Sequence, residues 1–193
     1  MGLLTWKGGT LEAPLPPALV SCGTPEHPNV LTIAWTGIVN TIPPMTYISV
    51  RPERYSYDLI KNSGEFVINL PTEELVPAID FCGVKSGRNL DKIAACGLHT
   101  EPGETVQAPL ILESPVHLEC KVRQVLSLGS HDMFLADITA VRVDEDYMDA
   151  NGRLCMERCH LAAYIHGTYY SIGQALGTFG FSVKKKQEKR KSS

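Results

Sequence analysis

The sequence contains no apolar run that approaches the roughly 20 residues of a membrane-spanning helix. Its first residues, MGLLTWKGGT, also lack the basic start and apolar block of a secretory signal. We therefore expect a cytoplasmic protein with no membrane partner.

Several motifs of common enzyme classes are missing too. No strand–GxGxxG–helix unit or Walker-type loop is present, so the chain lacks the usual device for gripping a dinucleotide. No nucleophile elbow, HExxH motif or convincing catalytic triad is found. The sequence therefore marks no side chain as a nucleophile or general acid, and we expect no catalytic residue.

The six cysteines do not form a recognisable metal-binding pattern. Cys155, Cys159 and His160 have a spacing that could hold a metal, but no second CxxC-type pair completes four ligands. In a chain of this length without a signal peptide, reduced buried thiols are favoured over disulfides. We expect no metal site.

The net charge of −3 hides an asymmetry along the chain. Residues 182–193 (SVKKKQEKRKSS) carry six basic residues and one glutamate, which leaves an acidic body. A basic run can bind nucleic acid or an anionic surface. Because the acidic body would oppose such binding, we interpret the run as a disordered solubilising tail and expect no nucleic-acid partner.

The hydrophobic pattern predicts strands with short helices between them. Alternation from Val116 places His117, Glu119, Lys121 and Arg123 on the polar face of a half-buried antiparallel strand. The predicted strands cover 18–22, 29–35, 45–50, 65–70, 116–123 and 133–143. Helices are predicted at 55–62, at 73–81 after a Thr72 cap, and around 90–97. This pattern favours a mainly β barrel with peripheral α-helices over a doubly wound sheet.

The most informative stretch of the chain runs from residue 29 to residue 64. Thr36–Pro44 is expected to be a connection between two strands, because a central strand would not carry Pro43-Pro44. Ser56 is a good N-cap candidate for the following helix. Arg51 and Arg54 beside that helix start favour a phosphate or carboxylate site. The alternative is an ordinary capped surface helix with solvated arginines.

In the order of its motifs, the chain resembles the flavin reductase-like family, FMN-binding split barrels that include the flavoredoxins. The motifs are NVLTIAWTG, a PP pair, YISVRPERYSYDLI and SGEFVINLP. The resemblance extends from about Pro14 to Gly180, lies closest to flavoredoxin, and implies a Greek-key antiparallel split barrel. We accordingly divide the chain into an arm at 1–13, a flavin reductase-like split-barrel domain at 14–181 and the tail at 182–193.

An FMN site needs cations and donors for the phosphate, hydrogen bonds for the polar edge of the ring, and an apolar or aromatic wall. Arg51, Ser56 and Lys92 are expected at the phosphate, with Arg54 and Lys85 in reserve. The resemblance matches Ser56 to the hydroxyl residue before the family's short helix. It matches Lys92 to the basic residue of the SGRxxDK segment.

For the isoalloxazine ring, the resemblance implies that a strand end forms part of the site. The residues implied are Asn29, for polar contacts, the backbone of Ala34, Trp35 and Thr36 along the ring edge, and His131 and Tyr164 near the flavin. The residues alone leave alternatives open: Trp35 could be plain core, and a hairpin residue such as His131 is usually solvated. Cys82 could lie near the site or fill core.

The resemblance implies an FMN-dependent oxidoreductase, in which the flavin carries the chemistry and NADH or NADPH is a possible transient electron donor. FMN would either stay bound, as in the flavoredoxins, or be reduced and released. The alternative from another class is a non-catalytic barrel that binds a flavin or another phosphate-bearing ligand. The family also implies a homodimer, which would cover barrel edges.

Overall fold

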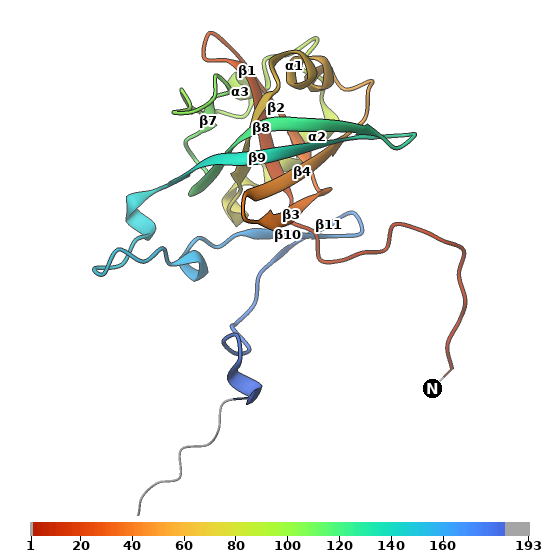
Figure 1. The fold of residues 1–193 in the computed structure, drawn as a ribbon, viewed down its shortest axis with the longest axis vertical. Coiled ribbons are helices and arrows are strands. Elements are labelled where there is room, and N and C mark those ends of the chain that lie inside the picture. The colour runs from red at the N-terminus through yellow and green to blue at the C-terminus, as the bar shows by residue number, and fades with distance from the viewer. Residues whose placement is uncertain (1, 184–193) are drawn as a thin grey trace, which may run out of the picture.

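Seven antiparallel strands form the main sheet of the computed structural model, which describes residues 2–183 (Figure 1). Across the sheet their order is β2-β1-β5-β8-β9-β4-β3. The strands are β1 (Ala18–Thr24), β2 (His27–Ile33), β3 (Thr36–Thr41), β4 (Pro44–Val50), β5 (Glu65–Leu70), β8 (Val116–Ser127) and β9 (Asp132–Val143). Most of the expected basic tail, residues 184–193, lies outside the described residues.

The sheet curls into a barrel, and the chain connectivity shows why. β2 and β3 are opposite edges of the sheet, yet only Ala34 and Trp35 separate them in sequence. The two edges must therefore meet at this junction, where the backbone N–H of Ser49 donates to the carbonyl of Trp35 at 3.0 Å and extends the β3–β4 pairing. This confirms the predicted mainly β split barrel.

Helices close one end of the barrel and cover one outer face (Figure 1). Tyr57 and Ile60 of α1 belong to the apolar cluster inside the barrel. Ile79 and Cys82 of α2 pack in a second cluster outside it, against the outer side of β1 and β2. The α-helices are α1 (Tyr55–Ser63), α2 (Val76–Val84) and α3 (Lys92–Ala95).

Shorter elements complete the fold. The 3₁₀ turns are η1 (Glu73–Leu75), η2 (Glu145–Tyr147), η3 (Met156–Arg158) and η4 (Phe181–Val183). Two small antiparallel sheets pair β6 (Thr100–Glu101) with β7 (Leu110–Ile111) and β10 (Ala162–Ile165) with β11 (Thr168–Ser171). Within residues 2–183, no helix is both long and apolar enough to traverse a bilayer.

Two expectations from the Asn29–Gly64 stretch are wrong. The Thr36–Pro44 connection is mostly strand β3, and its prolines are tolerated because Pro43 lies in the turn and Pro44 only begins β4. Ser56 is not the N-cap of α1. Arg54 holds the extended N-cap conformation, and Ser56 lies inside the helix.

Two further helix predictions need correction. Thr72 occupies an N-cap position, but its side chain makes no capping hydrogen bond, and the turn it precedes is the 3₁₀ turn η1. The helix expected around 90–97 is shorter: α3 covers Lys92–Ala95, and Asp91 caps it by accepting from the backbone N–H of Ala94.

The predicted polar face of β8 is solvated only in part. Lys121 is exposed, whereas His117 and Glu119 are buried under the 104–111 segment. Glu119 accepts hydrogen bonds from the backbone N–H groups of Glu104 (3.0 Å) and Thr105 (2.6 Å). The alternation does not predict that the 104–111 segment covers this face. Periodicity reports which side chains are polar, not which segments pack over them.

Candidate functional site

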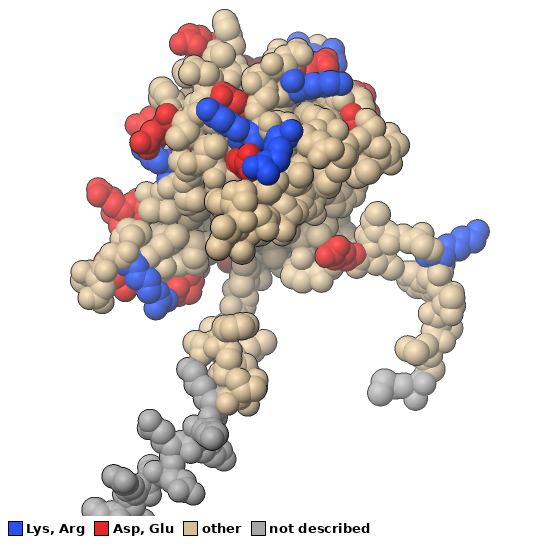
Figure 2. Space-filling view, in the orientation of Figure 1, with Lys and Arg blue, Asp and Glu red and all other residues tan. Residues whose placement is uncertain are grey.

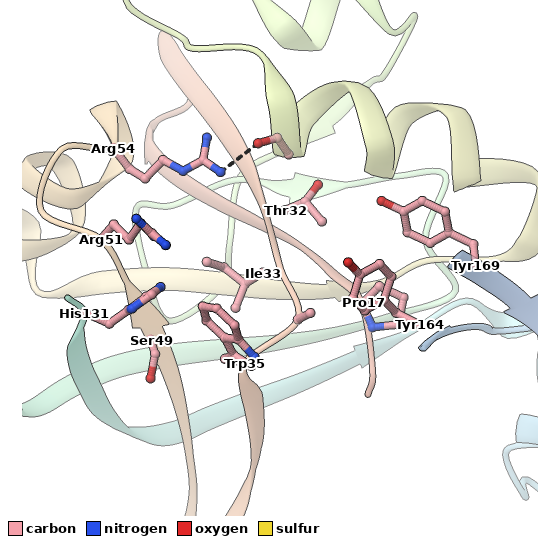
Figure 3. A pocket seen from close by; sticks show the side chains of 12 residues that line it. Pro17, Thr32, Ile33, Trp35, Ser49, Arg51, Arg54, His131, Tyr164 and Tyr169 are labelled. Atoms are coloured by element: carbon pink, nitrogen blue, oxygen red, sulfur yellow. Dashed lines mark hydrogen bonds between the residues drawn. The ribbon is translucent and has the colours of Figure 1, made fainter. Parts of the chain in front are cut away.

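The seam where β2 passes to β3 is hollowed by a cavity of about 280 Å³ (Figure 3), here called the seam cavity. The Ala34-Trp35 junction lies at its edge because the barrel closes there. Its lining residues are Pro17, Thr32, Ile33, Ala34, Trp35, Ser49, Arg51, Arg54, Gly83, His131, Tyr164 and Tyr169. Figure 3 shows Arg51, Arg54 and His131 at one end and the two tyrosines at the other.

Aromatic rings form much of the wall of the seam cavity. Trp35 is 40% exposed, so the core reading of this residue does not hold. The His131 ring meets Trp35 edge-on, with centroids 4.5 Å apart. The rings of Tyr164 and Tyr169 lie 5.3 Å apart. Such a wall suits a flat aromatic ligand.

His131 enters the cavity from the tip of the long β8–β9 hairpin, just before β9 begins. It therefore lies against Trp35 rather than in open solvent. Partial burial, reinforced by the nearby Arg51 guanidinium, lowers the pKa of His131. The imidazole is consequently neutral around pH 7 and can donate or accept a hydrogen bond at the cavity.

A second cavity, of about 460 Å³, adjoins the first and is here called the basic cavity. Arg51 and Arg54 line both, so the two cavities lie side by side and are here called the hollow. The basic cavity is lined by Leu31, Arg51, Glu53, Arg54, Tyr55, Ser56, Lys85, Ser86, Gly87 and Lys92. Four basic side chains face one carboxylate, so the surplus positive charge favours an anion.

Lys92 is the most constrained cation of this set. It is only 4% exposed, and its Nζ donates to the carbonyls of Cys82 and Lys85 at 3.3 Å each. Within residues 2–183, no carboxylate forms an ion pair with it. Burial lowers the pKa of Lys92, and an anion in the basic cavity would supply the missing counter-charge.

Ser56 forms the floor of the basic cavity next to Lys92, and Asn29 supports it from behind. Ser56 is 2% exposed, and its Oγ accepts a 2.6 Å hydrogen bond from Asn29 Nδ2. A hydroxyl that already accepts in this way is left with its proton to donate. Gly87 crosses above so closely that a Cβ there would lie 2.2 Å from Asn29 Oδ1. Only glycine lets the 85–87 segment approach the floor.

The donor set fits FMN on these observations. Arg51, Ser56, Lys85 and Lys92 are cations or donors at one end, as a phosphate monoester requires. The aromatic wall and the backbone at Ala34 stand at the other end, as an isoalloxazine ring requires. The two cavities together reach the roughly 300–1,000 Å³ typical of small-molecule sites.

The structure gathers most of the expected site residues in this hollow. Ala34, Trp35, Arg51, Ser56, Lys92, His131 and Tyr164 line it, as do the reserve residues Arg54 and Lys85. Asn29 lies behind Ser56 and outside both linings. Thr36, whose backbone was expected along the ring, is also outside them, and its buried Oγ1 donates to the Tyr47 carbonyl at 2.6 Å. Cys82 fills core in α2.

Sequence reasoning missed several lining residues, among them Thr32, Ser49, Ser86 and Tyr169. Tyr169 left a readable signal. His166 and Gly167 have positive φ and turn the β10–β11 hairpin, so a two-residue turn puts Tyr169 directly across from Tyr164. The others face the cavity only because the barrel closes, which no local pattern reports.

The segment of Cys155, Cys159 and His160 is the one whose spacing could hold a metal. Cys155 and Cys159 are buried thiols, and Cys159 Sγ contacts the Cys155 carbonyl at 3.8 Å. Throughout residues 2–183, no group of three or more His, Cys, Asp or Glu side chains is arranged to hold a metal ion.

A family model and a relative of known sequence match this chain. The family model described as "Flavin reductase like domain" matches residues 11–173. An uncharacterized protein of Aeropyrum pernix is 36% identical over 141 residues, which span 71% of this chain and 54% of that protein, about half its length.

Two solved structures superpose on nearly the whole chain. Flavoredoxin of Desulfovibrio vulgaris (Miyazaki F) is 31% identical with a TM-score of 0.87, covering 95% of this chain and 100% of that one. A flavoredoxin from Methanosarcina acetivorans is 25% identical with a TM-score of 0.86 at the same coverage.

Proposed function

The chain belongs to the flavin reductase-like family, and from this premise we propose that it is a flavoredoxin-like oxidoreductase that transfers electrons through bound FMN. One observation carries the proposal: the hollow has an aromatic wall at the barrel seam and, at its other end, a buried lysine that no carboxylate of residues 2–183 pairs with. This polarity matches FMN, which joins a flat ring to a phosphate. The similarity to two flavoredoxins supports the same assignment.

The residues divide the binding task between them. Lys92, Ser56 and Arg51 would hold the phosphate, with Lys85 and Arg54 at the rim. Arg54 is itself fixed by donating to the carbonyl of Gly83 at 2.7 Å. Because Lys92, Ser56 and Arg54 are held by hydrogen bonds before any ligand arrives, little of their freedom is lost when the phosphate binds.

At the other end, Trp35 and Tyr164 would flank the ring, and His131 would offer a neutral hydrogen-bonding group beside it. Bound flavin supplies the redox chemistry by accepting a hydride or electrons. The chain's residues orient the ring and limit the access of water to it. NADH or NADPH is the proposed transient donor, docking at the open mouth without a dinucleotide-binding motif.

An absorbance spectrum of the purified protein tests the proposal. We expect a flavin spectrum that survives gel filtration and bleaches on anaerobic addition of NADH or NADPH. Rapid exchange with free flavin would instead indicate a reductase that releases its flavin. Flavin that binds but never bleaches, with these donors or with chemically reduced carriers, would indicate the non-catalytic barrel. A colourless protein that fails to bind added FMN would contradict the whole assignment.

Fluorescence gives a second readout of where the flavin binds, because the chain has only two tryptophans. Trp35 lines the seam cavity, whereas Trp6 lies in the N-terminal segment and is 73% exposed. Added FMN should quench the emission of Trp6→Phe, in which Trp35 remains. It should leave the emission of Trp35→Phe nearly unchanged. The opposite pattern would mean that the flavin ring does not bind at the seam cavity.

We also propose that the protein is a homodimer. The two terminal segments project from the body (Figure 2), and both carry large apolar side chains that are exposed. Leu4 is 87% exposed and Leu176 is 97% exposed. Surfaces of this kind favour burial against another chain. Sedimentation at micromolar concentration should give twice the chain mass, and a monomer would count against the proposal.

A further inference from the structure

Two thiols touch each other behind the basic cavity. Cys82 lies near the end of α2 and Cys96 is the residue that ends α3, and their sulfur atoms are 3.9 Å apart. Both are reduced in the structure. A disulfide needs about 2.05 Å between the sulfurs, so bonding would draw the two helix ends together by a small movement.

The segment between the two cysteines carries much of the basic cavity. It contains Lys85, Ser86, Gly87 and Lys92, and Lys92 Nζ donates to the carbonyl of Cys82 itself. A covalent link between Cys82 and Cys96 would therefore close a loop of the chain that contains these cavity residues. A change in the mobility of this loop also changes the cavity.

We propose that Cys82 and Cys96 form a reversible disulfide that fastens the 83–95 segment over the basic cavity and slows the release of the anionic ligand. The oxidant is a hydroperoxide. The part that concerns FMN rests on the proposed function, whereas formation of the disulfide does not.

The two thiols have different roles in the reaction. Cys96 is partly exposed and meets the peroxide first, and Cys82 is fully buried. The thiolate of Cys96 attacks one peroxide oxygen, the O–O bond breaks, and a sulfenic acid forms with release of water or an alcohol. Cys82 sulfur then attacks the Cys96 sulfur, and the hydroxyl leaves as water with the thiol proton of Cys82. Two thiols are oxidised and one peroxide is reduced.

The surroundings of Cys82 support this order of events. Burial, together with the neighbouring Cys96, raises the pKa of Cys82 to about 12, so it is a poor first nucleophile. Once Cys96 is a neutral sulfenic acid, its contribution to that shift disappears. The nearby Lys92 ammonium, which favours the thiolate, remains. A dithiol reductant reverses the bond by thiol–disulfide exchange.

Slower release follows from the loss of freedom in the linked segment. A ligand leaves the cavity more readily when the segment beside it moves away, and a cross-link at both ends of that segment removes such conformations. Lys85, Ser86 and Gly87 would thereby stay near the bound phosphate. A ligand without a phosphate makes little use of these residues and should not be affected.

The experiment compares reduced protein with protein treated with one equivalent of hydrogen peroxide, both loaded with FMN or riboflavin. Peptide mass spectrometry identifies the linked cysteines, and flavin fluorescence follows release after dilution. We expect a Cys82–Cys96 linked peptide and FMN release slowed at least about threefold, with riboflavin release unchanged. Cys96→Ser and Cys82→Ala should abolish both effects. Cys155→Ser, which removes a buried thiol elsewhere, should preserve both.

Absence of the linked peptide would overturn the proposal. So would a linked peptide with FMN release unchanged or faster. Cys96 is partly exposed, so Cys96→Ser keeps the test valid even where Cys82→Ala proves unstable. Failure of the reduced protein to bind FMN would instead overturn the proposed function, and the peptide analysis, repeated on protein without flavin, would still decide whether the disulfide forms.

Discussion

Tyr57 Oη donates a hydrogen bond of 2.5 Å to Oδ2 of Asp132, and both side chains are buried. Tyr57 follows Ser56 in α1, and Asp132 follows His131 at the start of β9. One hydrogen bond therefore joins the helix that carries a residue of the basic cavity to the hairpin that carries a residue of the seam cavity. It fixes the basic cavity and the neighbouring part of the seam cavity relative to each other.

Tyr57→Phe should weaken both the fold and the site. Removing the donor leaves a buried carboxylate short of a partner, which costs about 1–3 kcal/mol of unfolding free energy. Flavin should be released faster because the hairpin tip is less firmly held. Urea unfolding and a release assay check the two effects. Tyr170→Phe, at an exposed position in β11, is the matched control and should change neither. Equal effects of the two substitutions would contradict the linking role.

Lys92→Met and Ser56→Ala should separate FMN from riboflavin. Loss of a charge-assisted contact from Lys92 costs about 1.5–3 kcal/mol, or roughly tenfold or more in FMN affinity. The Ser56 hydroxyl is expected to contribute about 1 kcal/mol. Riboflavin, which lacks the phosphate, should bind nearly as before. Fluorescence titration of both ligands gives the comparison.

Salt and a surface lysine provide the controls for this experiment. The difference between wild type and Lys92→Met should shrink as ionic strength rises, although burial of the site limits the screening. Lys121→Met, at an exposed position in β8, should leave both affinities unchanged. Equal losses for FMN and riboflavin in Lys92→Met would place the phosphate elsewhere.

Much of the fold could be predicted because the strands carry strong local signals. The runs at 65–70 and 133–143 match β5 and β9 closely. The errors arose where tertiary contacts decide. β3 is polar and proline-flanked, yet it is a strand because barrel closure gives it β4 as a partner. His117 and Glu119 look like solvent-facing residues, but the preceding 104–111 segment covers them, and Asn69 and the backbone of Glu104 satisfy their polar groups.

The part of the candidate site that is built from residues close together in the sequence could be predicted. Arg51, Arg54 and Ser56 lie close together in sequence, at a helix start, and a local argument brought them to the same place. Trp35 and His131 are 96 positions apart in sequence but 4.5 Å apart between ring centroids. Only the family resemblance suggested that pair. Ser49 and Thr32 meet at the cavity through sheet curvature, which leaves no mark in a single sequence.

Gly87→Ala tests whether the close approach of the 85–87 segment matters. The added Cβ would lie 2.2 Å from Asn29 Oδ1 and 2.8 Å from Tyr55 Cδ1. Asn29 is buried and holds Ser56, so it cannot move aside freely. Overpacking of this kind costs about 1–3 kcal/mol, and FMN affinity should fall with it.

Gly173→Ala is the control for that experiment, because a Cβ there meets nothing within 4 Å. It should change neither the urea midpoint nor the FMN affinity. If Gly87→Ala also changed neither, the 85–87 segment would have to be looser than the structure shows, and its proposed place over the phosphate would fail.

The buried His117 should make stability depend on pH in a defined window. Its Nδ1 lies 2.8 Å from Asn69 Oδ1, and it is only 6% exposed. Burial, with the nearby Arg142, lowers the pKa of His117 to about 4, from an ordinary value of 6.5. The unfolded chain therefore binds more protons between these values. Stability from this group is fully present above pH 6.5 and is lost as pH falls towards 4.

Between pH 7.5 and 5 this linkage amounts to about 2 kcal/mol of unfolding free energy. Urea unfolding at several pH values should show the loss in the wild type. His117→Gln keeps a donor for Asn69 but does not titrate, so its stability should change much less over the same window. His27→Gln, at an exposed strand end, should follow the wild type. If wild type and His117→Gln lost stability in parallel, His117 would take up its proton as readily in the folded chain as in the unfolded chain. Its contact with Asn69 would then not depend on a neutral ring.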